Sequence, residues 1–138
     1  MRFINEKLKQ MRELIFRGKL VKDSDSFKTY KKGVEIEGGF CKRVDETFIV
    51  AHFNVFEVEP ESVKQYTGFK DKNDIKIFEG DNLTDVVETD EGKVDSKNKV
   101  FWNEPTGSWH LDNSFNQDKT SSTELWLELN DFEYEVLS

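Results

Sequence analysis

The stretch Gln65–Asp81, with the sequence QYTGFKDKNDIKIFEGD, carries the strongest fold signals in the chain. Its centre, residues 71–74, consists of short polar and charged side chains that suit a tight turn. Ile75 and Ile77 recur at a spacing of two, which predicts a strand with one face toward a core. Gly80, in the triplet Glu-Gly-Asp, allows a sharp reversal of the chain. The stretch therefore predicts two turns within a β structure.

The same stretch predicts which of its side chains are buried. Tyr66 and Phe69 have large apolar rings that should pack inward together with Ile75 and Ile77. Residues 70–73, with the sequence KDKN, should lie at an exposed tip where charged side chains remain hydrated. We therefore interpret the stretch as scaffold more than as an active site.

Further strands are predicted on both sides of this stretch by alternating and β-branched segments. They cover residues 34–36, 48–51, 55–58, 100–102, 109–111, 125–129 and 132–136. Gly38-Gly39 should end the first of them. Pro60 suits the first turn of a short helix over residues 60–65, and Pro105 and Gly107 indicate a hairpin turn.

The N-terminal part has a different period. Ile4, Leu8 and Met11 recur at helical spacing with charged residues between them, which predicts a helix to about Gln10 and then a strand that stops at Gly18. The predicted fold class is therefore mainly β (a β-rich α+β domain). We expect a small barrel or curved sandwich with an N-terminal helix and one short helical turn.

Composition limits the class of protein. The 138 residues suit one domain, 1–138, and 12 Phe, 3 Tyr and 3 Trp can fill a core. The single cysteine, Cys41, excludes an internal disulfide and a cysteine-based zinc site, which fits a reducing cytosol. We expect Cys41 to be buried in a strand. The sequence contains no apolar run long enough to cross a membrane, so we expect a cytoplasmic protein with no membrane contact.

Charge is distributed unevenly along the chain. Residues 1–42 carry 11 Lys/Arg and 6 Asp/Glu, a net charge of +5, whereas residues 43–138 carry 9 and 22, a net charge of −13. The acidic part would repel a phosphate backbone, so nucleic-acid binding is disfavoured. The basic part keeps a nucleic-acid-binding module open as an alternative.

No residue pattern specifies a catalytic, cofactor-binding or metal site. His52 and His110 lack metal-type spacing, so we interpret both as structural or surface residues. The acidic residues Glu79, Asp81, Asp85, Glu88, Asp90 and Glu91 lack the spacing of a calcium loop, so we interpret them as a solvated stretch. The aromatic residues Phe101, Trp102, Trp109 and Trp126 could stack on bases or sugars, but we expect them in the core.

Several segments resemble a known family. Gln65-Tyr-Thr-Gly68, Lys70-Asp-Lys-Asn73 and Ile77-Phe-Glu-Gly-Asp81 resemble the core motif of the YopX family of phage and prophage proteins. The segments MRELIFRGK (11–19) and EVEPESV (57–63) are similar to other segments of that family. The resemblance covers most of residues 11–137, with residues 1–10 as an N-terminal extension. Asp74 stands where the family has glycine.

The resemblance implies a small, β-rich, phage-encoded protein of unknown function, without established catalytic residues. Its motif residues, taken as structural, are Gln65, Tyr66, Thr67, Gly68, Glu79, Gly80 and Asp81. The Glu-Gly-Asp turn is similar to turns of small SH3-like barrels, although fold alone does not give function.

These observations predict a non-enzymatic accessory protein of a phage or prophage that binds a protein partner in the cytoplasm of the bacterial host. No cofactor is expected. Unpaired sheet edges at residues 48–51 and 55–58 also predict a homo-oligomer. Two alternatives remain: a nucleic-acid-binding module that uses the basic residues 1–42, and a small metal-dependent hydrolase that uses the acidic residues 79–91.

Overall fold

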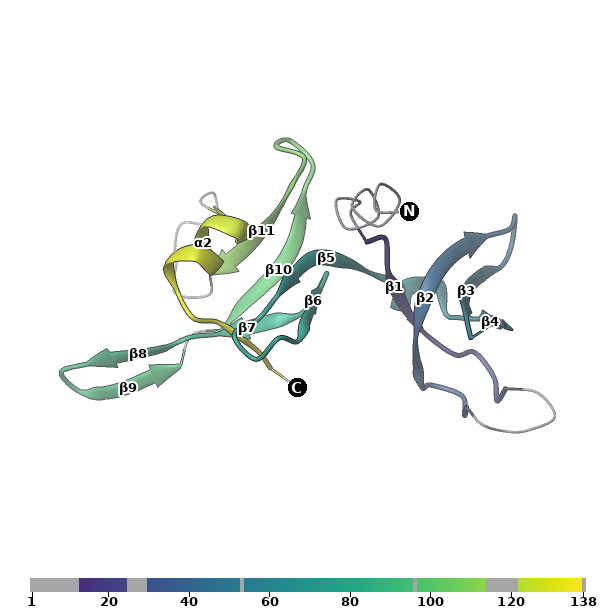
Figure 1. The fold of residues 1–138 in the computed structure, drawn as a ribbon, viewed down its shortest axis with the longest axis horizontal. Helices are drawn as coiled ribbons and strands as arrows, with labels where there is room; N and C mark the ends of the chain where they lie inside the picture. The colour runs from purple at the N-terminus through teal and green to yellow at the C-terminus, as the bar shows by residue number, and fades with distance from the viewer. Residues whose placement is uncertain (1–12, 25–29, 53, 96, 114–121, 138) are drawn as a thin grey trace, which may run out of the picture. The chain divides into compact units, whose positions relative to one another are not determined.

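The structure, a computed structural model, describes residues 13–24, 30–52, 54–95, 97–113 and 122–137. The described chain is mainly β, with antiparallel sheets of six and five strands, a separate two-stranded hairpin and one short α-helix near the C-terminus (Figure 1). The mainly β class that the sequence predicted is therefore confirmed. Neither sheet of the described residues closes into a barrel, because both strand orders are open. The helix predicted for residues 1–10 lies outside the described residues.

The chain divides into two compact units, residues 1–68 and 69–138. The first contains β1 (Phe16–Lys19), β2 (Glu35–Lys42), β3 (Thr47–Ala51), β4 (Asn54–Glu57), the 3-10 helix η1 (Pro60–Ser62) and most of β5 (Lys64–Lys70). The six-stranded sheet has the order β4-β3-β2-β1-β5-β6, where β6 is Lys76–Phe78. The strands predicted near residues 48–51 and 55–58 are confirmed. The helix predicted over residues 60–65 is confirmed only for Pro60–Ser62, because Lys64 and Gln65 already belong to β5. β4 lies at an edge of the sheet, whereas β3, also expected at an unpaired edge, is paired on both sides.

The core of the first unit follows the two-residue period of its strands. Ile49 is fully buried and pairs in register with Phe56 of β4, so both side chains lie on the same face. Leu20, Ile36 and Val58 complete the buried cluster. The ring of Tyr30 meets that of Phe56 edge to face, with 5.5 Å between centroids. Alternation along β3 and β4 thus places one apolar face inside.

Gly38 and Gly39 were expected to end a strand, and this prediction is wrong. β2 runs through both glycines to Lys42 and pairs with β1 on one side and β3 on the other. A Cβ on Gly38 would overlap the carbonyl oxygen of Val50 and lie 3.0 Å from the Cβ of Ala51. Gly38 therefore permits a close approach of two backbones inside the sheet rather than a break.

Gly38→Ala is expected to lower the free energy of unfolding by about 2–3 kcal/mol, because the added methyl group must displace backbone atoms. Gly39→Ala is the matched control, since a Cβ there lies 4.0 Å from the nearest atom, the Val50 carbonyl oxygen. Urea denaturation of both variants measures the difference. Equal stability of the two variants would contradict the close approach at Gly38.

The second unit contains short strands and the helix. After the end of β5 and β6 come β7 (Asn82–Thr84), β8 (Val86–Thr89), β9 (Gly92–Asp95), β10 (Asn98–Asn103), β11 (Ser108–Asn113), β12 (Thr123–Glu124), α2 (Leu125–Asp131) and β13 (Glu135–Val136). The five-stranded sheet has the order β12-β11-β10-β7-β13, and β8 and β9 form the separate hairpin. The predicted β10–β11 hairpin is confirmed, with Gly107 in its turn at a φ of +62°.

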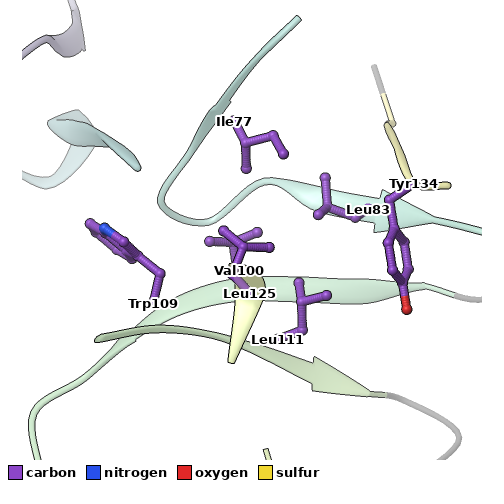
Figure 2. Packing of buried hydrophobic residues seen from close by; sticks show 7 residues of the cluster. All are labelled: Ile77, Leu83, Val100, Trp109, Leu111, Leu125 and Tyr134. Carbon is purple, nitrogen blue, oxygen red and sulfur yellow. The ribbon is translucent and has the colours of Figure 1, made fainter. Parts of the chain in front are cut away.

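Seven buried residues form the core of the second unit. They are Ile77, Leu83, Val100, Trp109, Leu111, Leu125 and Tyr134. Figure 2 shows their side chains pointing toward one another, with Trp109 at one end of the cluster and Tyr134 at the other. This core draws its members from β6, β7, the β10–β11 hairpin, α2 and the segment before β13.

Residues 125–129 were predicted as a strand, but they form the first part of α2. Leu125 is fully buried and Leu129 packs against the same core, a spacing of four that suits one helix face. The segment LWLEL fits both an alternating and a helical pattern, and it has no β-branched residue to favour a strand. Of the strand predicted at 132–136, only Glu135–Val136 is a strand.

Candidate functional site

The first half of the central motif lies in β5. Gln65 pairs in register with Phe16 of β1, and the N–H of Tyr66 donates to the carbonyl of Ile15 at 2.8 Å. Tyr66 and Thr67 are only 4% and 3% exposed. Because adjacent strand residues point to opposite faces, β5 is covered on both faces at this point.

Gly68 follows in the left-handed region, with a φ of +90°, and a Cβ added there would meet no atom within 4 Å. Glycine is thus needed there for its backbone conformation and not for lack of space. All four residues from Gln65 to Gly68 therefore shape or fill the strand.

The second half of the motif, Glu79-Gly80-Asp81, forms a tight turn after β6. The N–H of Asp81 donates to the carbonyl of Phe78 at 3.1 Å, and the N–H of Phe78 donates back to Oδ2 of Asp81 at 2.8 Å. Gly80 has a φ of +82°, as the reversal required. Two further bonds join the turn to β10: Gly80 N–H donates to the Val100 carbonyl, and Val100 N–H donates to the Asp81 carbonyl. Asp81 is 8% exposed and acts here as a backbone acceptor.

Gly80→Val is expected to cost about 1–3 kcal/mol of stability, because a β-branched residue is strained at positive φ. Gly80→Asn is the matched control, since asparagine tolerates this region better. Thermal melting should rank the variants as parent, then Asn, then Val. An unchanged midpoint for Gly80→Val would show that the position imposes no such backbone requirement.

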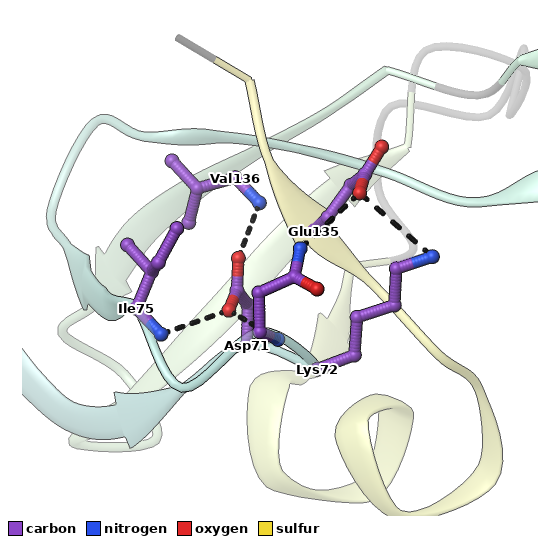
Figure 3. Close-up of polar contacts among 6 residues, drawn as sticks. Asp71, Lys72, Ile75, Glu135 and Val136 are labelled. Carbon is purple, nitrogen blue, oxygen red and sulfur yellow. Dashed lines mark hydrogen bonds and ion pairs between the residues drawn. The ribbon is translucent and has the colours of Figure 1, made fainter.

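Asp71 organises the loop between β5 and β6 and ties it to the C-terminal strand (Figure 3). Its Oδ1 accepts from the N–H of Asn73 at 2.8 Å and from the N–H of Ile75 at 2.9 Å. Its Oδ2 accepts from the N–H of Val136 at 2.9 Å, which lies 65 positions further along the chain. One carboxylate therefore holds three backbone donors.

Other contacts strengthen the same junction. The N–H of Lys72 donates to the carbonyl of Tyr134 at 3.0 Å, and its Nζ lies 3.8 Å from Oε2 of Glu135. Asn73 Nδ2 donates to the same Glu135 oxygen at 3.3 Å. The N–H of Leu137 donates to the carbonyl of Asn82 at 2.8 Å. The loop and β7 together hold residues 134–137 in place.

Two predictions for this loop are wrong. Asp71 was expected at an exposed tip but is 7% exposed, because its carboxylate is surrounded by the backbone groups that it binds. Ile75 was expected inside but is 50% exposed, because β6 begins only at Lys76 and the strand period does not extend back to residue 75. Lys70, Lys72 and Asn73 are exposed as predicted.

Asp74, which stands where the resembling family has glycine, has a φ of +63°. The turn therefore keeps the left-handed conformation with a side chain present, and short polar residues tolerate that conformation better than others. Lys70 Nζ lies 3.5 Å from its carboxylate, but both groups are well exposed, so this pair adds little stability.

Tyr134 links α2 to this junction. Its hydroxyl donates to Oε2 of Glu128 at 3.0 Å. Burial raises the pKa of Tyr134 well above its ordinary value, and the bond to Glu128 and the negative charges of Glu128 and Asp85 raise it further. Tyr134 therefore remains a neutral donor at physiological pH.

His110 lies on β11, and its imidazole is surrounded by three hydroxyl groups. It is 6% exposed, its Nδ1 lies 2.7 Å from Oγ of Ser122, and its Nε2 lies 3.0 Å from Oγ of Ser108 and 3.1 Å from Oγ1 of Thr106. These contacts include no carboxylate to orient the imidazole as a general base. His52 is exposed in the turn after β3, at a φ of +51°. Structural roles for both histidines stay predictions.

The described residues of the acidic stretch were compared with the geometry of a metal site. Among the described residues, no group of three or more His, Cys, Asp or Glu side chains lies close enough to hold a metal ion. Asp81 binds the backbone of its own turn, and Glu91 is exposed between β8 and β9.

The aromatic and thiol candidates differ from the expectation. Trp109 is in the core, as predicted, but Trp102 and Trp126 are 40% and 47% exposed. Phe101 is half-buried, and its ring centroid lies 5.9 Å from that of His110. Cys41 was expected inside but is exposed, because the last residues of β2, from Phe40 to Lys42, lie beyond the part of the strand that the core covers.

These features define a small antiparallel β protein. The residues of its central motif build strands and tight turns, and the loop between β5 and β6 is hydrogen-bonded to the C-terminal strand β13. Its family follows from sequence comparison. The family model described as YopX protein matches residues 12–134, so the chain belongs to the YopX family, as the resemblance predicted. A comparison with curated proteins and one with solved structures each gave no match. In the part of the chain that the structure describes, no helix is long and apolar enough to cross a membrane.

Proposed function

We propose that this YopX-family chain is an accessory protein of a phage or prophage that acts by binding a protein partner, without catalysis of its own. The observation that carries this proposal is the exposure of Trp102 and Trp126, two of the three tryptophans. Tryptophan is highly buried on average in folded proteins and is among the residue types most enriched in interface hot spots. Two half-exposed tryptophans therefore favour a surface that a partner covers.

The charge of the chain favours protein over nucleic acid as that partner. Both tryptophans lie in residues 43–138, which carry a net charge of −13. A nucleic acid would have to bring its phosphates against this charge, whereas a protein with basic residues would be attracted to it.

Site-specific photo-crosslinking tests the proposal. A benzophenone amino acid replaces Trp102 or Trp126, one at a time, in the chain expressed in a bacterial host that carries the phage. We expect ultraviolet light to produce a discrete adduct with a second protein at both positions. Lys99, which is exposed on β10, is the control position and should give none.

The adducts distinguish the partners. An adduct of twice the 16.2 kDa chain mass would identify a second copy, in agreement with the predicted homo-oligomer. An adduct that nuclease shortens would instead support nucleic-acid binding. The absence of any adduct at both tryptophan positions would contradict the proposal.

A further inference from the structure

The outward side of α2 exposes large apolar side chains. Leu125 is fully buried and Leu129 packs against the core of the second unit, so the opposite side of the helix faces away from that core. Trp126 and Leu127 are 47% and 41% exposed, and Phe132, directly after the helix, is 51% exposed. Exposed apolar side chains that gather on one segment, unlike single scattered ones, mark an interaction site.

The same segment is acidic. From Glu124 to Glu133 it contains four Asp/Glu residues and no Lys or Arg. The carboxylate of Glu124 accepts from Nε1–H of Trp126 at 2.6 Å, which places a negative charge at the edge of the indole. Asp131 and Glu133, on either side of Phe132 in the sequence, are exposed. This surface therefore suits an occupant that is apolar on one face and positively charged beside it.

The first twelve residues of the chain have the complementary character. Their sequence, MRFINEKLKQMR, contains four Lys/Arg and one Asp/Glu, a net charge of +3. Ile4, Leu8 and Met11 recur at helical spacing, so a helix formed by this segment presents them on one face, with Lys7 and Arg12 at its two borders. Twelve helical residues span about 18 Å, which exceeds the roughly 10 Å of the seven-residue α2.

We propose that residues 1–12 of one copy of the chain bind the outward side of α2 in a second copy. The apolar face of the segment covers Trp126 and Leu127, and its basic side chains pair with carboxylates of the surface. In a symmetric pair each copy provides one segment and one surface, so the contact is made twice and the dimer is closed. This inference goes beyond the proposed function, because it assigns α2 to self-association and leaves Trp102 to the partner protein.

Charge favours this occupant over others. A nucleic acid would bring its phosphates against the four carboxylates of residues 124–133. A neutral sugar or an uncharged peptide would gain nothing from those carboxylates. A basic amphipathic segment of another protein would have the right character, but residues 1–12 are present at the same concentration as α2 in every population of the chain.

Sedimentation equilibrium of the full chain with two charge-reversal variants tests the proposal. Lys7→Glu with Arg12→Glu reverses the borders of the segment, and Asp131→Lys with Glu133→Lys reverses the surface. We expect the parent to form a dimer of twice the 16.2 kDa chain mass, and each variant alone to associate at least about tenfold more weakly. An equimolar mixture of the two variants should form the dimer again, because it combines one parental contact with one whose charges are both exchanged.

Two tryptophan variants test the apolar part of the contact. Trp126→Ala should weaken the dimer by about tenfold or more, as loss of an aromatic hot spot does. Trp102→Ala is the matched control, because it removes an exposed tryptophan from β10 and should associate like the parent. Thermal melting checks that every variant is folded.

Three results would overturn the inference: a monomeric parent at high concentration, a dimer that persists undiminished in either charge-reversal variant, or a mixture that associates no better than its components. A segment that bound α2 of its own chain would give the first of these. The proposed function fails separately, since a monomeric chain that still gave crosslinked adducts with another protein would leave it standing.

Discussion

Asp71→Ala is expected to destabilise the second unit by about 3–5 kcal/mol, because three charge-assisted bonds to backbone N–H groups are lost together. Each such bond is worth about 1.5–3 kcal/mol, and water replaces part of this in the variant. Two of these donors shape the loop between β5 and β6, and the third, Val136 N–H, fixes β13. The variant should therefore loosen both the loop and the C-terminal strand. Urea denaturation measures the overall loss, and hydrogen exchange at the Val136 amide measures the release of β13.

Two variants control for this experiment. Asp71→Asn keeps one oxygen that can still accept from the loop, but its NH₂ group would face the N–H of Val136, so we expect an intermediate loss. Lys72→Ala removes an exposed side chain and its pair with Glu135, and should change stability by only about 0.5 kcal/mol. If Asp71→Ala matched Lys72→Ala, the carboxylate would not be the group that holds the junction.

The use of Asp71 and Asp81 bears on the alternative of a metal-dependent hydrolase. Both carboxylates are buried, and each accepts from a backbone N–H group of the turn in which it lies. A metal ion that took an oxygen of Asp81 would compete with its bond to Phe78 N–H, and so with the turn itself. The carboxylates of Asp71 and Asp81 therefore hold the backbone of their own turns.

The parts of the fold that follow local rules could be predicted from the sequence. The alternation at Phe48–Ala51 and the Pro105 and Gly107 turn residues indicated the correct strands and hairpin, because period and turn chemistry act within a few residues. The positive φ of Gly80 could be predicted for the same reason.

The parts that depend on distant residues could not be predicted. Gly38 leaves room for the backbone of Val50 in the neighbouring strand. The residues next to Gly38 in the sequence do not distinguish a glycine of this kind from one that ends a strand. Aspartate side chains often accept from the N–H two residues further on, so the Asp71–Asn73 bond could have been predicted. The bond to Val136 could not, because it depends on the pairing of β13 with β7.

The scaffold interpretation of the motif depends most on Tyr66. Tyr66→Ala is expected to destabilise the protein by about 3–5 kcal/mol, because its large ring is only 4% exposed and truncation would leave a cavity beside β5. Phe69 is half-buried against the core of the second unit, so Phe69→Ala should cost less. Thermal melting and urea denaturation measure both variants.

Matched variants separate the ring from its hydroxyl and from general effects on β5. Tyr66→Phe keeps the ring and should retain most of the stability. Lys70→Ala, at the exposed end of the same strand, should stay within about 0.5 kcal/mol of the parent. A binding surface would give the opposite pattern, since its truncation leaves folding intact and removes the partner. If Tyr66→Ala and Phe69→Ala both melted like the parent and lost the crosslinked adducts, the motif would belong to the binding surface and the scaffold interpretation would be wrong.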